Sequence, residues 1–191
     1  MHWNIETERE DDGRCSPRAH DRKVFAFEPV AHNFSMLLAT IHKAGLRNVT
    51  PLKVALSDRV GSREMVIPDS SISDHRLAKF AIEWQRGRQE WVQAETLDHL
   101  LEIGQISPPK FVKCDVEGAS GEVIRGAGGI IRKHKPAWLI EIWYSSEFDL
   151  MSDLGYCAFA GSSRLVPASH FDPTTADYFF LPADRVDSFN T

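Results

Sequence analysis

One stretch near the N-terminus, KVFAFEPVAHNFSMLLATIHKAGLRNV (Lys23–Val49), places a short apolar run, an acidic turn and a helical period in direct succession. Val24–Phe27 has the composition of a buried strand, and apolar residues recur at helical spacing from Phe34 to Ile41. Glu28 stands where the strand ends. In nucleotide-binding α/β folds an acid at this place binds a ribose, and a glycine-rich loop precedes it by about 20 residues.

The same succession of strand and helix patterns continues along the chain, and it predicts a doubly wound, mostly parallel sheet. The last segment, DYFFLP, follows no clear helix and predicts an antiparallel edge strand. Lys110–Cys114 and Ala137–Ile142 are continuous apolar runs with a helical segment between them, so we expect adjacent parallel strands buried on both faces. The remaining strands are expected at Asn48–Leu56, Arg63–Ile67 and Glu90–Ala94, and helices at Ala31–Ala44, Leu77–Trp84, after Thr96 and at Glu122–Arg132.

The length and net charge of the chain limit the classes of protein to which it can belong. The 191 residues suit one domain, which we place at residues 23–191, behind a polar and poorly ordered leader at residues 1–22. A net charge of −5 argues against a nucleic-acid partner. No apolar run is long enough for a membrane span or a signal peptide, which makes a cytoplasmic setting the default.

The N-terminal residues carry few apolar side chains. Met1, Trp3, Ile5, Cys15 and Ala19 are scattered without a strand or helix period. A buried parallel strand is normally a near-continuous apolar run, so we expect no segment here to occupy the centre of the sheet. The first strand would then be missing or atypical. The sheet would close imperfectly, or a second chain would cover its edges, as in a homodimer.

Acidic or polar residues follow most of the expected strands. Glu28, Ser57, Asp115 and Glu141 would therefore meet at the carboxyl edge of a parallel sheet, where ligands bind. Glu28 has a second interpretation as a cap of the following helix. Asp115 and Glu117 could line one cleft, where their repulsion would raise one pKa and suit a general base. The alternative there is a solvated turn in which Gly118 supplies conformational freedom.

Other catalytic patterns are missing. The eight histidines show no H-E-x-x-H spacing, and neither a G-x-S-x-G elbow nor a G-x-x-x-x-G-K-[ST] loop occurs. The three cysteines form no C-x-x-C pair. Hydrolase and NTPase functions therefore have little support, and we assign no metal site.

Several motifs, taken together, resemble FkbM-type methyltransferases. They are FAFEPVAHNFSMLLATIHKAGLRNVTPLKVALSDRVG, QAETLDHLL, FVKCDVEGASGEVIRGAGGII, KPAWLIEIW and DYFFLP, and they follow the order of the family over Val24–Pro182. Two positions depart from the family pattern, Ala31 in place of proline and Ser120 in place of an acid. The family's first strand and its D-x-G-A-x-x-G loop have no counterpart in Met1–Arg22.

The resemblance implies a Rossmann-like fold and an S-adenosylmethionine-dependent O-methyltransferase acting on a hydroxyl of a sugar or small metabolite. It implies that Glu28 binds the ribose of the cofactor and that Leu56 and Ser57 border the adenine. Asp115 and Glu117 would face the methyl-transfer pocket, with a carboxylate removing the hydroxyl proton. Without the glycine loop we expect weak affinity for the cofactor.

Two other functions stay open at this point. The first is a non-catalytic binding or interaction module on the same scaffold, which the missing loop favours. The second is an unrelated sugar or nucleotide enzyme that uses Asp115 and Glu117. The insertion Asp69–Gln89 could cover the acceptor, and Trp84 and Trp91 could stack on its ring or simply pack.

Overall fold

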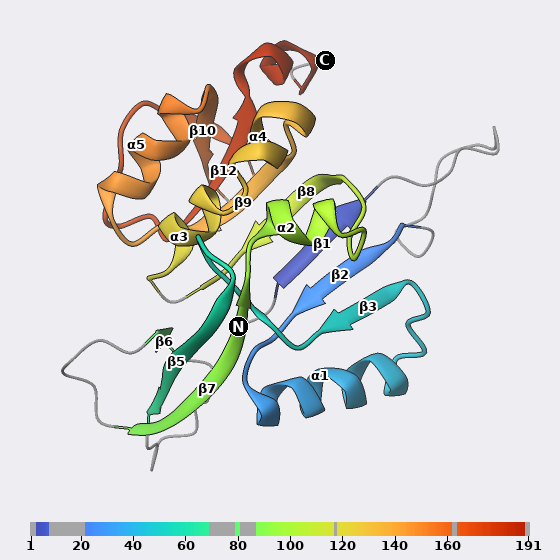
Figure 1. The fold of residues 1–191 in the computed structure, drawn as a ribbon. Helices are drawn as coiled ribbons and strands as arrows, with labels where there is room; N and C mark the ends of the chain where they lie inside the picture. The colour runs from blue at the N-terminus through green and yellow to red at the C-terminus, as the bar shows by residue number, and fades with distance from the viewer. Residues whose placement is uncertain are drawn as a thin grey trace, which may run out of the picture.

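The computed structural model describes residues 3–7, 22–68, 79–80, 87–116, 118–161 and 164–189 of the chain. These residues form an eight-stranded sheet, a four-stranded sheet and the helices around them (Figure 1). The strands are β1 (Trp3–Thr7), β2 (Val24–Phe27), β3 (Val49–Leu52), β4 (Ala55–Leu56), β5 (Gly61–Pro68), β6 (Lys79–Phe80), β7 (Gly87–Glu95), β8 (Pro109–Cys114), β9 (Ala137–Glu141), β10 (Tyr156–Ala160), β11 (Val166–Ala168) and β12 (Asp177–Pro182). The helices are α1 (Ala31–Lys43), α2 (Leu97–Glu102), α3 (Ser120–Arg125), α4 (Gly128–His134), α5 (Ser145–Asp153) and the 3₁₀ helix η3 (Ala183–Phe189).

The large sheet has the strand order β11-β10-β12-β9-β8-β1-β2-β3. β2 pairs with β3 in parallel, and β8 pairs with β9 in parallel, as the apolar runs predicted. β12 pairs antiparallel with both β9 and β10, and β11 extends that edge. The predicted α/β fold and the antiparallel pairing of DYFFLP are therefore confirmed, but DYFFLP forms the interior strand β12, and the edge strand is β11.

The strand at the centre of this sheet contradicts our expectation for the N-terminal residues. We expected no segment of the N-terminal residues to lie there, yet β1 lies between β2 and β8 and runs antiparallel to both. The strand is atypical in direction, since the neighbours on either side run parallel to each other. A short strand can fill this place because the hydrogen bonds of a sheet come from the backbone, and the neighbours' N–H and C=O groups would be costly to bury unpaired. The expected polar leader between Glu8 and Asp21 lies outside the described residues.

The helices cover the two faces of the sheet unequally. The crossovers β2-α1-β3 and β8-α3-α4-β9 run in opposite directions across the sheet, so right-handed connections place their helices on opposite faces. α2 packs against α4, and α5 packs on β10 beside α3. The main core lies under this group and includes Trp138, Ile140, Val112 and Cys114, each less than 1% exposed.

The other face of β8 and β9 is less protected. Phe111, Lys113 and Leu139, which alternate with the core residues, are only half-buried. Among the described residues α1 is the helix on that face, and none of its residues is fully buried. The expectation that both strands are buried on both faces was therefore wrong, because most of the described helices pack on a single face.

A second sheet, with the order β4-β7-β5-β6, extends from the body of the protein, and its long strands β5 and β7 pair antiparallel (Figure 1). Its small core contains Val30, Ala55, Met65, Ile67, Val92 and Ala94. The expected strand Asn48–Leu56 is divided between the sheets, with β3 in the large one and β4 in the small one. The expected helix Leu77–Trp84 was wrong at Lys79–Phe80, which pair with β5 as β6 because the hairpin edge offers backbone partners. Its other residues lie outside the described part.

Helix boundaries follow local chemistry. The Thr96 hydroxyl accepts the His99 amide at 3.0 Å and caps α2, as expected. The expected helix Glu122–Arg132 is instead divided into α3 and α4 at Gly126 and Ala127.

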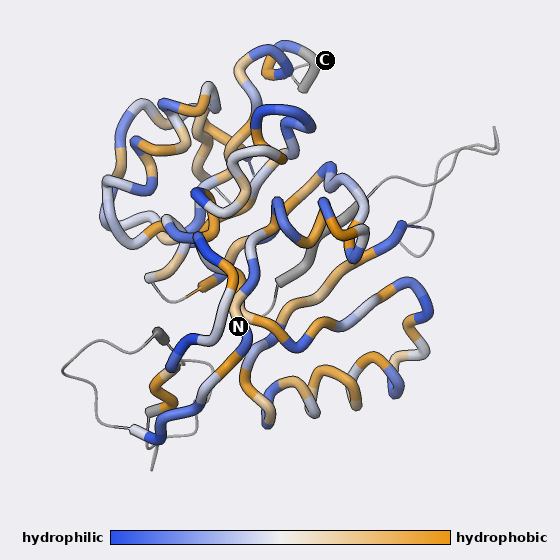
Figure 2. Tube along the Cα trace, viewed as in Figure 1, coloured by the Kyte–Doolittle hydropathy of each residue, from blue (hydrophilic) through white to orange (hydrophobic). Residues whose placement is uncertain are grey.

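Figure 2 shows apolar residues along the strands and hydrophilic residues at loops and at the C-terminal end of α4. No helix in the described part of the chain is long and apolar enough to cross a membrane.

Candidate functional site

Strand direction brings three predicted acids to one edge of the large sheet. β1 runs antiparallel to both β2 and β8, so β2, β8 and β9 all point the same way. Glu28 follows β2, Asp115 follows β8, and Glu141 is the last residue of β9. Neighbouring strands lie about 4.8 Å apart, so the three residues are distributed over roughly 15 Å of the carboxyl edge.

Glu28 is the most buried of these acids, with 1% of its surface exposed. Its Oε1 atom accepts the Val30 amide at 2.8 Å, and Val30 is the N-cap residue of α1. Burial raises the pKa of the Glu28 carboxyl, and the Val30 amide opposes this rise. Oε2 is buried as well and accepts no hydrogen bond within the described part of the chain.

The two interpretations of Glu28 are therefore compatible. Oε1 supports the start of α1, and Oε2 can accept a bond from a further donor. The Asn33 side chain also acts on this carboxyl, where its hydrogen bond lowers the pKa. A buried carboxylate oxygen without a partner is costly, because desolvation is not offset by a new bond. This oxygen is the feature of the edge that fits a ligand carrying hydroxyl groups.

Asp115 begins the turn after β8. Its side chain is 42% exposed and accepts a 2.7 Å hydrogen bond from the Lys113 ammonium, so the two residues form an ion pair at the edge. Gly118 has a φ of +71°, which confirms that this turn needs a residue free to adopt a left-handed conformation. Glu117 lies outside the described residues, and its predicted role as the second carboxylate stays a prediction.

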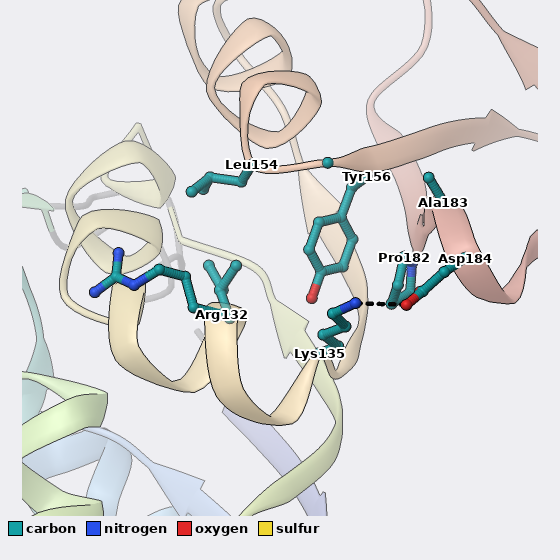
Figure 3. Close-up of a pocket in the computed structure, with 9 residues that line it drawn as sticks. Arg132, Lys135, Leu154, Tyr156, Pro182, Ala183 and Asp184 are labelled. Carbon is teal, nitrogen blue, oxygen red and sulfur yellow. Dashed lines mark hydrogen bonds and ion pairs between the residues drawn. The ribbon is translucent and has the colours of Figure 1, made fainter.

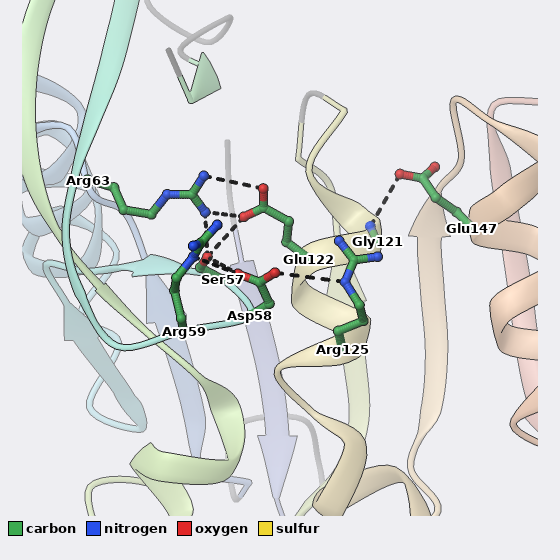
Figure 4. Close-up of polar contacts among 8 residues, drawn as sticks. All are labelled: Ser57, Asp58, Arg59, Arg63, Gly121, Glu122, Arg125 and Glu147. Atoms are coloured by element: carbon green, nitrogen blue, oxygen red, sulfur yellow. Dashed lines mark hydrogen bonds and ion pairs between the residues drawn. The ribbon is translucent and has the colours of Figure 1, made fainter. Parts of the chain in front are cut away.

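Ser57 joins a polar network between β4, the β5 hairpin and α3 (Figure 4). Its side chain is buried, donates to Glu122 Oε2 at 2.9 Å and accepts from Arg63 Nη1 at 2.6 Å. Arg63 also forms an ion pair with Glu122 through both nitrogens of its guanidinium end. Ser57 is thus held by this pair, and its side-chain hydrogen bonds within the described residues go to Arg63, Glu122 and Asp58 rather than to Glu28 or Asp115.

Asp58 extends the same network on its exposed side. Its carboxylate lies 3.3 Å from Arg59 Nε and 3.9 Å from Arg125 Nε (Figure 4). Leu56, which was expected to border the adenine, is 2% exposed and packs in the main core. The Leu56 side chain therefore packs in the core under the turn that begins at Ser57.

A second buried acid, Glu147, fixes the loops that follow β8 and β9. Its Oε1 accepts the Gly121 amide at 3.2 Å, and its Oε2 accepts the Trp143 amide at 3.0 Å (Figure 4 draws the bond to Gly121). The Ser120 hydroxyl donates to the Glu141 carbonyl at 2.9 Å. These bonds join the segment that follows β8 to the segment that follows β9.

Glu122, Arg63 and Glu147 were not among the residues selected from the sequence. Their role depends on contacts between segments far apart in the chain, and the only local signal is an acid in the first turn of α3 and of α5. In the described part of the chain, no group of three or more His, Cys, Asp or Glu residues is arranged to hold a metal ion.

Known proteins are similar to this chain in sequence and in fold. The family described as the methyltransferase FkbM domain matches residues 11–159. The hexuronic acid methyltransferase AglP of Haloferax volcanii is 32% identical over 112 residues, which cover 59% of this chain and 43% of AglP. The crystal structure of methyltransferase FkbM from Methylobacillus flagellatus KT superposes with a TM-score of 0.54 at 16% identity, over 83% of this chain and 36% of that one. The chain therefore spans less than half the length of either protein.

Proposed function

Because this chain belongs to the FkbM methyltransferase family, we propose that it is an S-adenosylmethionine-dependent O-methyltransferase acting on a hydroxyl of a sugar or small metabolite. The observation that carries the proposal is the buried Oε2 atom of Glu28, which accepts no hydrogen bond in the described part of the chain. A ribose offers hydroxyl donors at the end of a strand in this kind of fold.

The residues along the edge fit the other parts of the cofactor. Ser57, held by Glu122 and Arg63, would border the adenine, with Leu56 packed beneath the same turn. Asp115, at the end of β8, lies further along the edge, beside the place where the methyl group would be transferred.

The proposed reaction requires no covalent bond between the protein and the cofactor or the acceptor. The cofactor, when bound, supplies a methyl group activated on a sulfonium. The chain has to hold the acceptor oxygen in line with that methyl and take up the hydroxyl proton. Asp115 is the carboxylate proposed for the proton, with Glu117 as the second, and the Lys113 ammonium fixes the position of Asp115.

The acceptor class is part of this proposal. AglP is named as a hexuronic acid methyltransferase, and this relative supports a sugar as the acceptor. At 32% identity over part of the chain, the support is for the class of compound rather than for one sugar.

A second function, a non-catalytic binding module, is favoured by the direction of β1. Trp3 pairs with Phe27 near the carboxyl edge, whereas Thr7 pairs with Pro109 at the opposite edge. The chain that follows β1 therefore leaves at the amino edge, away from Glu28. A glycine-rich loop that directly follows the central strand would be at the wrong edge to contact the cofactor.

Calorimetry with S-adenosylhomocysteine distinguishes the two functions. For the methyltransferase we expect saturable binding that Glu28→Gln weakens at least about tenfold, since a bond between a charged group and a hydroxyl contributes about 1.5 to 3 kcal/mol. Glu102→Gln, a change to an exposed acid of α2, is the matched control and should leave the affinity unchanged. No binding by the unaltered chain, or equal binding by Glu28→Gln, would exclude the proposed cofactor site.

A further inference from the structure

The start of helix α1 is held by two acids that come from different sheets. The Val30 amide donates to Glu28 Oε1 at 2.8 Å, and the next amide, that of Ala31, donates to Glu90 Oε1 at 3.1 Å. Glu28 follows β2 of the large sheet, whereas Glu90 lies in β7 of the small sheet. Figure 1 shows β7 passing beside the first turn of α1. The Glu90 contact therefore connects the small sheet to the turn that carries Glu28.

The side chain of Val30 strengthens this connection. Val30 is 1% exposed and belongs to the core of the small sheet, together with Val92 and Ala94 of β7. Alternate residues of a strand lie on the same face, so Glu90 is on the face of β7 that packs against Val30. The turn between β2 and α1 is thus bound to the small sheet by apolar packing as well as by a hydrogen bond.

Both oxygens of the Glu90 carboxylate are in use. Oε2 accepts a hydrogen bond from Arg88 Nη2 at 3.0 Å, while Oε1 accepts the Ala31 amide. The Glu90 side chain is 17% exposed and that of Arg88 is 62% exposed, so the acid is set into the contact and the arginine stays at the surface. The arginine therefore orients the carboxylate without burying a second charge.

Glu90 supplies an acceptor that α1 itself lacks. The helix has no acid in its first turn, and its N-cap residue, Val30, offers no side-chain hydrogen bond. The first amides of a helix have no partner within it, and the helix dipole favours a negative charge beside them. In α1 this charge comes from β7, on the other sheet.

The charge of Glu90 also acts on Glu28. Burial is the largest cause that raises the pKa of the Glu28 carboxyl, and repulsion from Glu90 adds to this rise. The two carboxyls are therefore neighbours at the start of α1, and the Arg88 guanidinium on Glu90 limits their repulsion.

We propose that Glu90 is a positioning residue for the cofactor site, because it fixes the first turn of α1 and so holds the Glu28 carboxyl in the orientation that leaves Oε2 to the ribose. This inference rests on the proposed function, in which that oxygen binds the ribose hydroxyls. Glu28 Oε1 holds the Val30 amide only while the turn keeps its shape, and the small sheet holds the turn through Glu90 and the Val30 side chain. Glu90 acts through Glu28 and does not contact the cofactor itself.

Amide hydrogen exchange of the isotope-labelled full chain, followed by NMR without ligand, tests the contact. Glu90→Ala removes the acceptor and should speed exchange of the Ala31 and Val30 amides at least about threefold. Glu90→Gln keeps a side-chain oxygen as acceptor and should preserve slow exchange at both amides. The matched control is Glu64→Ala, which changes an acid opposite Trp91 on the other face of the small sheet and should leave both amides as they are.

Calorimetry with S-adenosylhomocysteine tests the effect on the cofactor site. Glu90→Ala should weaken binding at least about threefold, whereas Glu90→Gln should stay within about twofold of the unaltered chain, since the lost hydrogen bond is restored. Glu64→Ala should bind as the unaltered chain does. A thermal melt of each variant checks that the chain is folded, and the Gln variant separates the hydrogen bond from any general loss of stability.

The positioning role is overturned if Glu90→Ala leaves both the Val30 amide and the affinity unchanged, or if Glu90→Gln is as damaging as Glu90→Ala. The same loss in Glu64→Ala would also overturn it, because the effect would then belong to the small sheet as a whole. Absence of binding by the unaltered chain would overturn the proposed function, and the exchange rates alone would then decide whether Glu90 holds the turn that carries Glu28.

Discussion

The backbone of Gly126 approaches the carbonyl oxygen of Ser57 so closely that a Cβ atom on this glycine would lie 2.0 Å from that oxygen. The contact joins the turn after β4 to the end of α3, the point where the helix predicted at Glu122–Arg132 is divided. The Gly126 carbonyl also accepts the Asp98 amide at 3.1 Å, so the glycine is held from the side of α2 as well.

Replacing Gly126 with alanine should destabilise the protein by about 3 kcal/mol. The added methyl meets backbone atoms of Ser57, which cannot move without displacing the turn, and overpacking of this kind costs about 1 to 3 kcal/mol or more. Urea unfolding followed by circular dichroism measures the effect. Gly128→Ala is the control, because its Cβ would meet only the flexible end of Arg132, and a change within about 0.5 kcal/mol is expected there. Equal stability of the two variants would contradict the close contact.

Arg63 and Glu122 should show a measurable coupling. Their side chains are 21% and 24% exposed, so solvent screens the pair less than it screens a surface pair. A double-mutant cycle with Arg63→Met and Glu122→Gln should give a coupling free energy of about 1 to 2 kcal/mol. The pair Arg88 and Glu90, with Arg88 62% exposed, serves as the comparison and should give less. A coupling near zero for Arg63 and Glu122 would show that the network does not stabilise the turn.

Glu147→Ala should destabilise the protein by about 3 kcal/mol, because it leaves the amides of Gly121 and Trp143 without their acceptor. Unfolding of the variant and of the unaltered chain in guanidinium chloride measures the difference in their free energies of unfolding. Glu102→Ala, at an exposed position of α2, should change the stability by less than about 0.5 kcal/mol. If Glu147→Ala were as mild as this control, the loops after β8 and β9 would have to be held by other bonds.

The stability of the protein should depend on pH through Glu28. Its folded pKa is raised by burial, so between the unfolded value near 4.5 and the folded value the folded state binds more protons than the unfolded state. The contribution of this group to stability is therefore present below pH 4.5 and is lost as the pH rises through the folded pKa. Relative to Glu28→Gln, the unaltered chain should become less stable as the pH rises through this window. A difference that stays constant from pH 4.5 to neutral pH, or that grows in favour of the unaltered chain, would contradict the raised pKa.

Several features of the fold could be predicted because they depend on residues close together in the sequence. Val24–Phe27 followed by apolar residues at helical spacing forms β2 and α1, and the Thr96 cap starts α2 where it was expected. The parallel pairing of β8 with β9 follows from two apolar runs joined by a helical segment. The acids Glu28, Asp115 and Glu141 then share one edge as a consequence of strand direction.

Other features were decided by the tertiary structure. The scattered residues of Trp3–Thr7 carry no strand period, and β1 fills its place through backbone hydrogen bonds, which do not require such a period. The partners of Ser57, which are Arg63 and Glu122, lie 6 and 65 residues away along the chain. Ile131 of α4, Tyr156 of β10 and Pro182 of β12 are far apart in the sequence, yet they line one pocket (Figure 3). Periodicity determines which residues a strand or helix buries, whereas contacts between distant segments depend on how those elements pack, and only the folded chain contains that information.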